Sequence, residues 1–311
     1  MKGKQDLYKF IIKRIFLMIL TLIIIMAMLI PLILLMPAKG YAWHPESPEI
    51  FIEVCVYYFK QIFLQFNFGI KQGTYQDVAG WIAEQMPYTL YVTIPALIIS
   101  LPLGTFFGAL AALYKNRWQD QIINVVITLL VSVPEFVTGM MIQYFIGFKL
   151  NMFPLIFGYG DNFFSWELFR TAIMPIIALI LPPMATCMRY IRGELSESLT
   201  SEYVLLARVK GLTRRQTLIR HAFRNSMMPL LPMYQSCIIA VFTGSFFVER
   251  IFSIPGIGRT FINSMVEGWQ DVFLCLAMFY TILTLVAGLV TDVGYGLIDP
   301  RIRIGTKKTE L

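Results

Sequence analysis

The sequence predicts an all-α membrane protein with six transmembrane helices, and three observations lead to that prediction. Of its 311 residues, 57% are hydrophobic and only 14% are charged, whereas soluble domains carry about 25% charged residues. Several apolar stretches are long enough to cross a bilayer as helices. The Lys and Arg residues gather in alternate connecting segments, as membrane orientation requires. The net charge of +7 therefore does not indicate nucleic-acid binding.

The six spans are expected at residues 10–36, 88–114, 121–149, 171–192, 228–248 and 272–298. The first follows a basic N-terminus, as the apolar part of a secretion signal would. Its apolar run is too long for a signal peptide, so we expect it to be retained. On the second span, Gly104, Gly108 and Ala112 form a stripe of small residues that predicts close packing against another helix.

Orientation follows from the basic residues, because 19 of the 26 Lys and Arg residues fall on the side that carries the N-terminus. Cytoplasmic connections are rich in Lys and Arg, so both termini are expected in the cytoplasm. The chain then divides into an N-terminal segment with the first span (1–36), an extracellular segment (37–87), a core with five spans (88–303) and a cytoplasmic tail (304–311).

Two extracellular segments have features of their own. The aromatic-rich stretch Ile50–Phe66 predicts a helix that lies along the membrane surface. The connection 249–271 contains the sequence Pro255-Gly256-Ile257-Gly258, whose residue types predict a turn.

The long cytoplasmic loop, 193–227, predicts two short helices separated by Gly211. Ser196 or Ser201 can cap the first helix, at about 195–209, and Gly211 supplies the positive φ that ends it. Thr213 then caps a second helix that runs to Asn225. On the second helix, apolar residues recur at spacings of three and four and share one face. They are Leu218, Ile219, Ala222, Phe223 and Met227.

The residues of this loop leave two interpretations open. An amphipathic loop can rest on the anionic headgroups of the inner leaflet. The same loop can also be a docking element for a soluble partner.

Short motifs in the chain resemble those of a known family. The matching residues of the cytoplasmic loop are Glu202-Tyr203-Val204, Ala207-Arg208, Lys210-Gly211-Leu212, His221-Ala222, Arg224-Asn225 and Pro229. They resemble the "EAA" loop of binding-protein-dependent ABC permeases, most closely that of oligopeptide and dipeptide permeases. Further matches are Pro87-Tyr88-Thr89-Leu90, Ser132-Val133-Pro134, Glu249, Ile251-Phe252, Pro255-Gly256-Ile257-Gly258-Arg259, Asp292, Tyr295 and Asp299-Pro300-Arg301. The resemblance covers nearly the whole chain and is closest to the first of the two paired permease subunits.

The resemblance implies a type I ABC importer permease in a bacterial cell membrane. The implied partners are a second homologous permease, two cytoplasmic ATPase subunits and an extracellular binding protein that delivers oligopeptides or dipeptides. ATP and magnesium are expected on the ATPase subunits, because this chain has no G-x-x-x-x-G-K-[ST] phosphate loop. The chain itself is expected to be no enzyme and to bind no cofactor or metal.

The same resemblance implies that the cytoplasmic loop couples transport to ATP hydrolysis. The first short helix would lie in a groove of an ATPase subunit, with Ala207 small enough to allow close approach. The implied coupling residues are Glu202, Tyr203, Ala207, Arg208, Lys210, Gly211, His221 and Asn225.

The chain departs from the family pattern at two places. Asn67-Phe68-Gly69 stands where the family has an acidic residue before its glycine, and Glu135 follows Pro134 where a small or apolar residue is usual. A carboxylate at the centre of a span costs about 2.5–3.5 kcal/mol, so Glu135 is expected to face a polar cavity or a partner. Either it belongs to the translocation path, or it is a protonated or locally paired carboxyl beside a proline kink.

The outer loop that begins at Glu249 resembles the loop against which the binding protein of such importers docks. Its alternative role is a gate that closes the outer mouth, and its candidate residues are Glu249, Pro255, Gly256 and Gly258. The cargo stays open, because related permeases carry nickel chelates and other small solutes.

Two other function classes have little support in the sequence. A secondary transporter usually has several buried ionisable groups, and an intramembrane enzyme needs clustered nucleophiles or metal ligands. The spans offer Glu135 and Asp292, and the two histidines, His44 and His221, are expected on opposite sides of the membrane.

Overall fold

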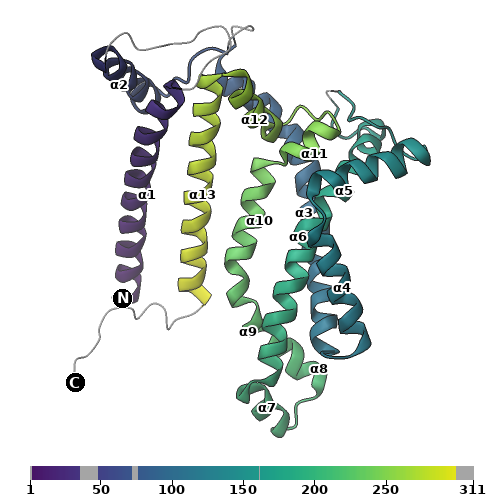
Figure 1. The fold of residues 1–311 in the computed structure, drawn as a ribbon. Coiled ribbons are helices and arrows are strands. Elements are labelled where there is room, and N and C mark those ends of the chain that lie inside the picture. The colour runs from purple at the N-terminus through teal and green to yellow at the C-terminus, as the bar shows by residue number, and fades with distance from the viewer. Residues whose placement is uncertain (1, 36–47, 72–75, 161, 299–311) are drawn as a thin grey trace. The chain divides into compact units, whose positions relative to one another are not determined.

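The computed structural model describes residues 2–35, 48–71, 76–160 and 162–298 (Figure 1). These residues form α1 (Lys2–Leu34), α2 (Pro48–Gln65), α3 (Val78–Leu113), α4 (Trp118–Ser132), α5 (Glu135–Ile142), η1 (Gln143–Lys149), α6 (Trp166–Thr200), α7 (Glu202–Val209), α8 (Arg214–Thr217), η2 (Leu218–Phe223), α9 (Arg224–Ser226), η3 (Met228–Leu230), α10 (Leu231–Thr243), α11 (Phe246–Ile251), α12 (Ile257–Glu267) and α13 (Gln270–Ile298). The all-α prediction is confirmed. The predictions for His44, for Asp299-Pro300-Arg301 and for the tail 304–311 lie outside the described residues.

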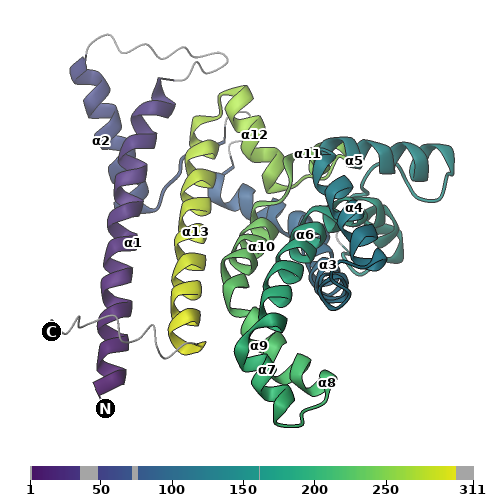
Figure 2. The ribbon, with the colours of Figure 1, turned by 60° about the horizontal axis from the view of Figure 1, so that its bottom comes forward.

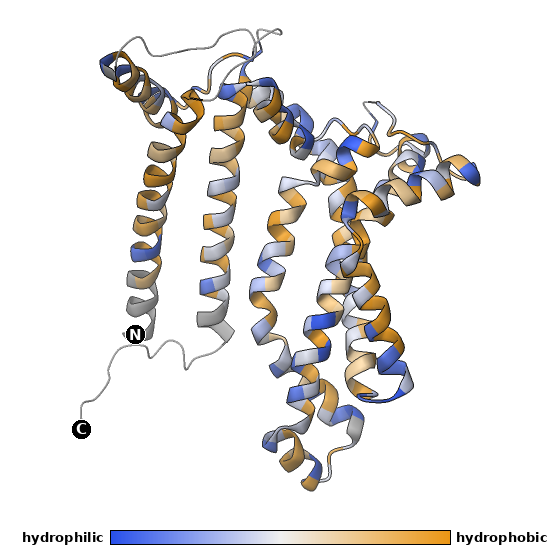
Figure 3. Ribbon diagram, viewed as in Figure 1, coloured by the Kyte–Doolittle hydropathy of each residue, from blue (hydrophilic) through white to orange (hydrophobic). Residues whose placement is uncertain are grey.

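Five segments of the described chain are long and apolar enough to cross a membrane, and a sixth candidate is a bent pair of helices. The pair consists of Trp118–Ser132 and Glu135–Lys149, which meet at an angle of 97°. The prediction of one continuous span at 121–149 is therefore wrong. Pro134 forces the residue before it out of the helical region, and Val133 is accordingly extended, with φ −82° and ψ 121°. Figure 3 shows α4 mostly apolar, with a polar turn at its start.

The other spans are found, with different boundaries. Helix α3 begins at Val78, ten residues before the predicted start at 88, because Val78 and Ile82 continue its buried face. Helix α6 extends beyond 171–192 at both ends. The fifth span breaks at Gly244, which has φ +67°, so α10 and α11 are separate helices. The predicted turn at Pro255–Gly258 is shorter than expected, because Gly256 already caps α12.

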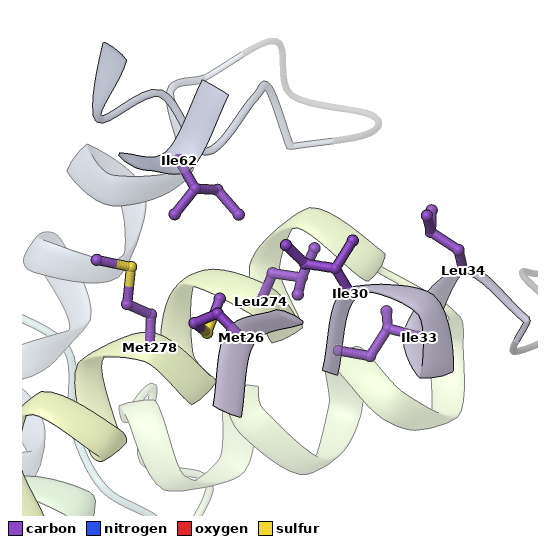
Figure 4. Packing of buried hydrophobic residues seen from close by; sticks show 7 residues of the cluster. All are labelled: Met26, Ile30, Ile33, Leu34, Ile62, Leu274 and Met278. Carbon is purple, nitrogen blue, oxygen red and sulfur yellow. The ribbon is translucent and has the colours of Figure 1, made fainter. Parts of the chain in front are cut away.

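The described residues group into two compact units. The first contains α1, α2, the beginning of α3, α12 and most of α13. One apolar cluster joins α1, α2 and α13, and Figure 4 shows Met26 and Ile30 of α1 beside Leu274 of α13. Its buried members are Met26, Ile30, Ile33, Leu34, Ile62, Leu274 and Met278. The helix predicted at Ile50–Phe66 is confirmed as α2; its position along a membrane surface stays a prediction.

Two polar contacts fix the direction of α1 against α13. Near the start of α1, Arg14 lies 3.1 Å from the carboxylate of Asp292, near the end of α13. At the other end of both helices, the Gln270 side chain donates to the Ile33 carbonyl at 3.2 Å. The two helices are therefore antiparallel, and the start of α1 and the end of α13 lie at the same end of this unit (Figure 1).

The second unit contains the rest of α3 together with α4–α11. Helices α3 and α6 of this unit lie close together. A Cβ atom built on Gly104 would lie 2.6 Å from the Cβ of Cys187, and one built on Gly108 would lie 2.7 Å from the Met188 carbonyl. Ala112 is 4% exposed in the same stripe. The predicted packing role of these small residues is confirmed.

Different helices lie at the two ends of the second unit. Figures 1 and 2 show α7 and α8 at one end, together with the turn between α3 and α4, and α5 with α11 at the other. The first of these ends is the one to which the sequence assigned most of the basic residues.

We expect Gly108→Leu to lower the stability of the protein by about 1–3 kcal/mol, because the added side chain has to push backbone apart. Thermal unfolding of the purified protein in mild detergent measures the change. Gly193→Ala is the matched control, because Gly193 lies on α6 with open space around it. Unfolding midpoints that are the same for Gly108→Leu and the control would contradict the packing role.

Candidate coupling surface and translocation cavity

The candidate coupling element is a helical hairpin, α7 to α9, attached to the end of α6. The first helix of the loop was predicted at 195–209, and its predicted start is wrong. Residues 195–200 belong to α6, and α7 begins at Glu202. Leu195 and Ser198 are buried there, so the buried face of α6 continues to its last turn. Ser201 separates the two helices, and its hydroxyl donates to the Ser198 carbonyl at 2.5 Å.

Helix α7 presents two different faces. Val204 and Ala207 point into the chain and are 0% and 6% exposed. Val204 belongs to a buried cluster with Leu195, Ala112 and Ala222. On the opposite side, Leu205, Leu206 and Val209 are 50%, 55% and 83% exposed. We call these three residues the apolar row.

The inward position of Ala207 corrects the expectation that this residue makes room for an ATPase subunit. Its side chain lies inside the hairpin, and its carbonyl accepts from the Leu212 backbone at 3.3 Å. The small side chain therefore permits a close approach between parts of this chain.

The turn of the hairpin follows the sequence prediction. Gly211 has φ +85°, a conformation that L side chains rarely adopt. Thr213 and Gln216 then form a reciprocal cap: the Gln216 backbone donates to the Thr213 hydroxyl at 3.3 Å, and the Thr213 backbone donates to the Gln216 side chain at 3.1 Å.

The second arm of the hairpin is helical through α8, η2 and α9, with one wide turn at Leu218–Phe223. Ala222 is buried, and Leu218 and Phe223 pack beside it. The prediction that Ile219 shares this face is wrong, because its side chain is 56% exposed. The wide turn shifts the helical register.

Tyr203 ties the two arms to the end of α6. Its hydroxyl lies 2.5 Å from the Ser198 hydroxyl, which in turn donates to the Ala222 carbonyl at 3.0 Å. Burial alone would raise the pKa of Tyr203, but hydrogen bonds to Ser198, Ser201 and Asn225 hold the pKa below its ordinary value. Tyr203 and Asn225 are therefore brought together, as predicted members of one site.

The remaining predicted coupling residues surround the apolar row. Glu202, Arg208 and Lys210 are exposed, and His221 is half-buried. The hairpin thus offers an apolar strip with charged residues of both signs around it.

A cavity of about 520 Å³ lies inside the second unit, and Glu135 is on its wall. The wall comes from α3, α6, α10 and both helix breaks, the one before Glu135 and the one at Gly244. The other lining residues are Thr93, Ala96, Leu97, Leu179, Pro182, Pro183, Thr186, Met233, Ser236, Cys237, Ala240, Val241, Ser245, Phe246 and Phe247. Glu135 is the one carboxylate among these described residues, and it opens the second half of the bent pair.

The residues of the candidate outer loop fall in different surroundings. Glu249 is 1% exposed on α11. Phe252, which follows α11, accepts from the Phe157 backbone at 2.7 Å. Gly256 caps α12, and Gly258 is buried in its first turn. Their part in docking or gating stays a prediction, and the buried Glu249 is more consistent with a gate than with direct contact to a partner.

Residues 104–304 match the family model described as "Binding-protein-dependent transport system inner membrane component". The chain belongs to this family. Its members include the permease components of ABC transporters, and the prediction from the loop motifs is confirmed.

Curated relatives of this permease extend over almost its whole length. The dipeptide transport system permease protein of Lactococcus lactis is 34% identical over 95% of this chain and 99% of the relative. The dipeptide transport system permease protein of Bacillus subtilis is 27% identical over 96% and 99%. The glutathione transport system permease protein of Escherichia coli K12 is 28% identical over 77% of this chain and 76% of the relative.

The fold of the permease also resembles a solved structure. An amino acid ABC transporter chain superimposes with a TM-score of 0.52 at 15% identity, covering 70% of this permease and 94% of that chain. The likeness confirms the type I importer fold.

One feature near the coupling hairpin was missed in the sequence. Asp120, at the start of α4, is 2% exposed and holds Arg192 of α6 through two contacts of 2.6 and 3.0 Å. The same carboxylate accepts from the Asn116 backbone at 2.9 Å and from the Asn124 side chain at 2.8 Å. We call this group the Asp120 lock. The only sequence signal was an acidic residue in the first turn of a span.

We expect Asp120→Asn to destabilise the protein by about 3 kcal/mol, because removing one partner leaves a partly buried charge without its counter-ion. Asp292→Asn should cost less than about 1 kcal/mol, because the side chains of the Arg14–Asp292 pair are 45% and 32% exposed, far more than that of Asp120. Thermal unfolding of both variants measures the contrast. Equal losses would contradict the structural role of the lock.

Proposed function

We propose that this chain is one of two permease subunits of an ATP-driven importer of short peptides. Three of its relatives are named for dipeptide or glutathione transport, which supports a peptide cargo. The proposed partners are a second homologous permease, two cytoplasmic ATPase subunits that bind ATP and magnesium, and an extracellular binding protein. The chain would cross the cell membrane several times, with both termini in the cytoplasm.

The observation that carries this proposal is the apolar row on α7. The uncharged stretch of α6 ends at Arg189, and the helix continues to Thr200, about 16 Å farther at 1.5 Å per residue. This distance supports a position of the apolar row beyond the hydrocarbon core, where lipid would not cover it. Exposed apolar residues with a charged rim are typical of a protein interface. This favours a soluble partner over the inner membrane surface as the contact of the hairpin.

The cavity supports the proposed role in moving a peptide across the membrane. Irregular backbone at membrane depth is tolerated where it lines a cavity or is buried in protein, and both helix breaks of the second unit lie on the cavity wall. The carboxylate of Glu135 faces a space large enough for a few amino-acid residues. This supports a place for Glu135 on the translocation path.

We expect Leu206→Ser to reduce the amount of ATPase that co-purifies with the permease by at least tenfold, because it removes an exposed anchor of the interface. Its side chain is already in water, so the fold should be unchanged. Ile156→Ser is the matched control, because Ile156 is 57% exposed in the connection between η1 and α6, which precedes the first turn of α6 and not the hairpin at its last turn. Undiminished co-purification with Leu206→Ser would contradict the coupling role.

We expect Glu135→Gln to lower uptake of a cationic peptide, such as trilysine, by about tenfold relative to trialanine. The carboxylate would attract the positive side chains, and a charge-assisted contact is typically worth about 1.5–3 kcal/mol. Uptake by cells or reconstituted vesicles that contain the whole importer measures the ratio. An unchanged ratio would remove Glu135 from the proposed path, leaving a structural role beside Pro134.

A further inference from the structure

The first unit contains a second, smaller cavity that the coupling and translocation roles do not use. Its volume is about 170 Å³. It lies among the end of α2, the segment after it and the start of α13. The lining residues are Tyr57, Tyr58, Gln61, Ile62, Asn67, Phe68, Gly69, Asp271 and Leu274. Asn67, Phe68 and Gly69 form the segment at which the sequence departs from its family.

Two oxygen acceptors of this cavity, on Asp271 and Gln61, carry the argument. The carboxylate of Asp271 receives a hydrogen bond from the Tyr58 hydroxyl. The carboxamide oxygen of Gln61 is buried and has no hydrogen-bond partner within the described residues. The Asn67 carboxamide oxygen already accepts from the Gly69 backbone at 2.9 Å. Buried polar groups normally find partners, so the cavity calls for a donor with a positive charge.

No basic side chain of the described residues forms an ion pair with Asp271. Lys71 shares a neighbouring hollow with Asp271. Its ammonium group instead lies 3.6 Å from the ring centre of Trp81 and 5.2 Å from that of Trp269. Burial lowers the pKa of Lys71, whereas a carboxylate in contact would raise it. Lys71 is therefore held by the two indole rings and leaves the carboxylate available.

The geometry around Gly69 keeps the Asp271 carboxylate in place. Gly69 has φ +82°, and a Cβ atom built on it would lie 2.9 Å from an Asp271 carboxylate oxygen. Its carbonyl accepts from the Val78 backbone at 3.2 Å. The carboxylate thus lies directly against backbone that only glycine fits, and any larger residue at position 69 would displace it.

The rest of the lining selects among cations. Calcium takes six to eight oxygen ligands. This cavity offers one carboxylate and the carboxamide groups of Gln61 and Asn67, beside apolar walls from Ile62, Phe68 and Leu274. Aromatic rings beside a carboxylate are typical of sites for organic ammonium groups. An ammonium group has three donors, enough for Asp271 and Gln61 together.

We propose that this cavity binds a primary ammonium group. The two sources of such a group at a membrane protein are the N-terminus of a peptide and an ethanolamine lipid headgroup. The chemistry of the site does not rest on the proposed transport function; only the choice of a peptide as its source does.

The test uses the purified full chain in phosphatidylcholine nanodiscs, with its co-purifying subunits but without ATP or binding protein. Saturation-transfer NMR titrations compare dialanine, N-acetyl-dialanine and ethylamine. We expect dialanine and ethylamine to bind and N-acetyl-dialanine to bind at least tenfold more weakly. Asp271→Asn should weaken dialanine binding about tenfold, whereas Glu84→Gln, an exposed carboxylate on α3, should leave it unchanged.

A second variant keeps the test valid where Asp271→Asn fails to fold. Gln61→Leu retains the carboxylate and removes the unpaired acceptor, and we expect it to weaken dialanine binding by about threefold. Nanodiscs with phosphatidylethanolamine distinguish the two sources: weaker dialanine binding there would assign the site to the lipid headgroup. Equal binding of the N-acetylated peptide, or competition by calcium at millimolar concentration, would overturn the proposal. Because no ATP is present, failure of the importer function would leave these results unaffected.

Discussion

The close contact between α3 and α6 is the constraint on which the second unit depends. Gly104 and Gly108 bring the α3 backbone against the α6 backbone at a distance that no side chain would allow. Helix α6 carries the coupling hairpin at its end and contributes Pro182, Pro183 and Thr186 to the cavity wall. The position of the hairpin and the shape of the cavity therefore both follow from packing along this one helix pair. Lipid gives helices no hydrophobic reason to associate, so the contact has to come from dispersion forces at short range.

The buried carboxylate of Asp120 lies where the structure satisfies it. The Asp120 lock joins α4 to α6 beside the hairpin, where the carboxylate has four donors in reach. Residues at both helix breaks, Glu135 and Gly244, line the same cavity. Glu135 is part of this arrangement, because Pro134 ends the hydrogen-bonded ladder just before it.

The sequence was sufficient for the features that depend on composition and local conformation. Hydrophobic runs located five spans, although they did not show the bend at Pro134. Gly211 and Thr213 located the turn of the hairpin, and the glycine stripe predicted the contact with a neighbouring helix. The boundaries of α3 and α6 were missed because their ends are amphipathic and continue in register with buried residues such as Val78 and Leu195. Ala207 and Ile219 were assigned to the wrong faces, because the junction at Ser201 and the wide turn of η2 change the direction of each face. The Asp120–Arg192 pair joins residues 72 positions apart, and no local pattern indicates such a contact.

The contacts of α7 and α4 with α6 determine how a movement of the hairpin would be transmitted to the cavity. Shifting a two-state equilibrium from 1:99 to 99:1 takes about 5.5 kcal/mol of differential binding, so the force cannot be lost in a flexible joint. Tyr203, Ser198 and the buried Val204 fasten α7 to the last turns of α6. The Asp120 lock fastens α4 to the same helix, and α4 leads to Glu135. A displacement of α7 would therefore move two walls of the cavity together, which is what a change in cargo access requires.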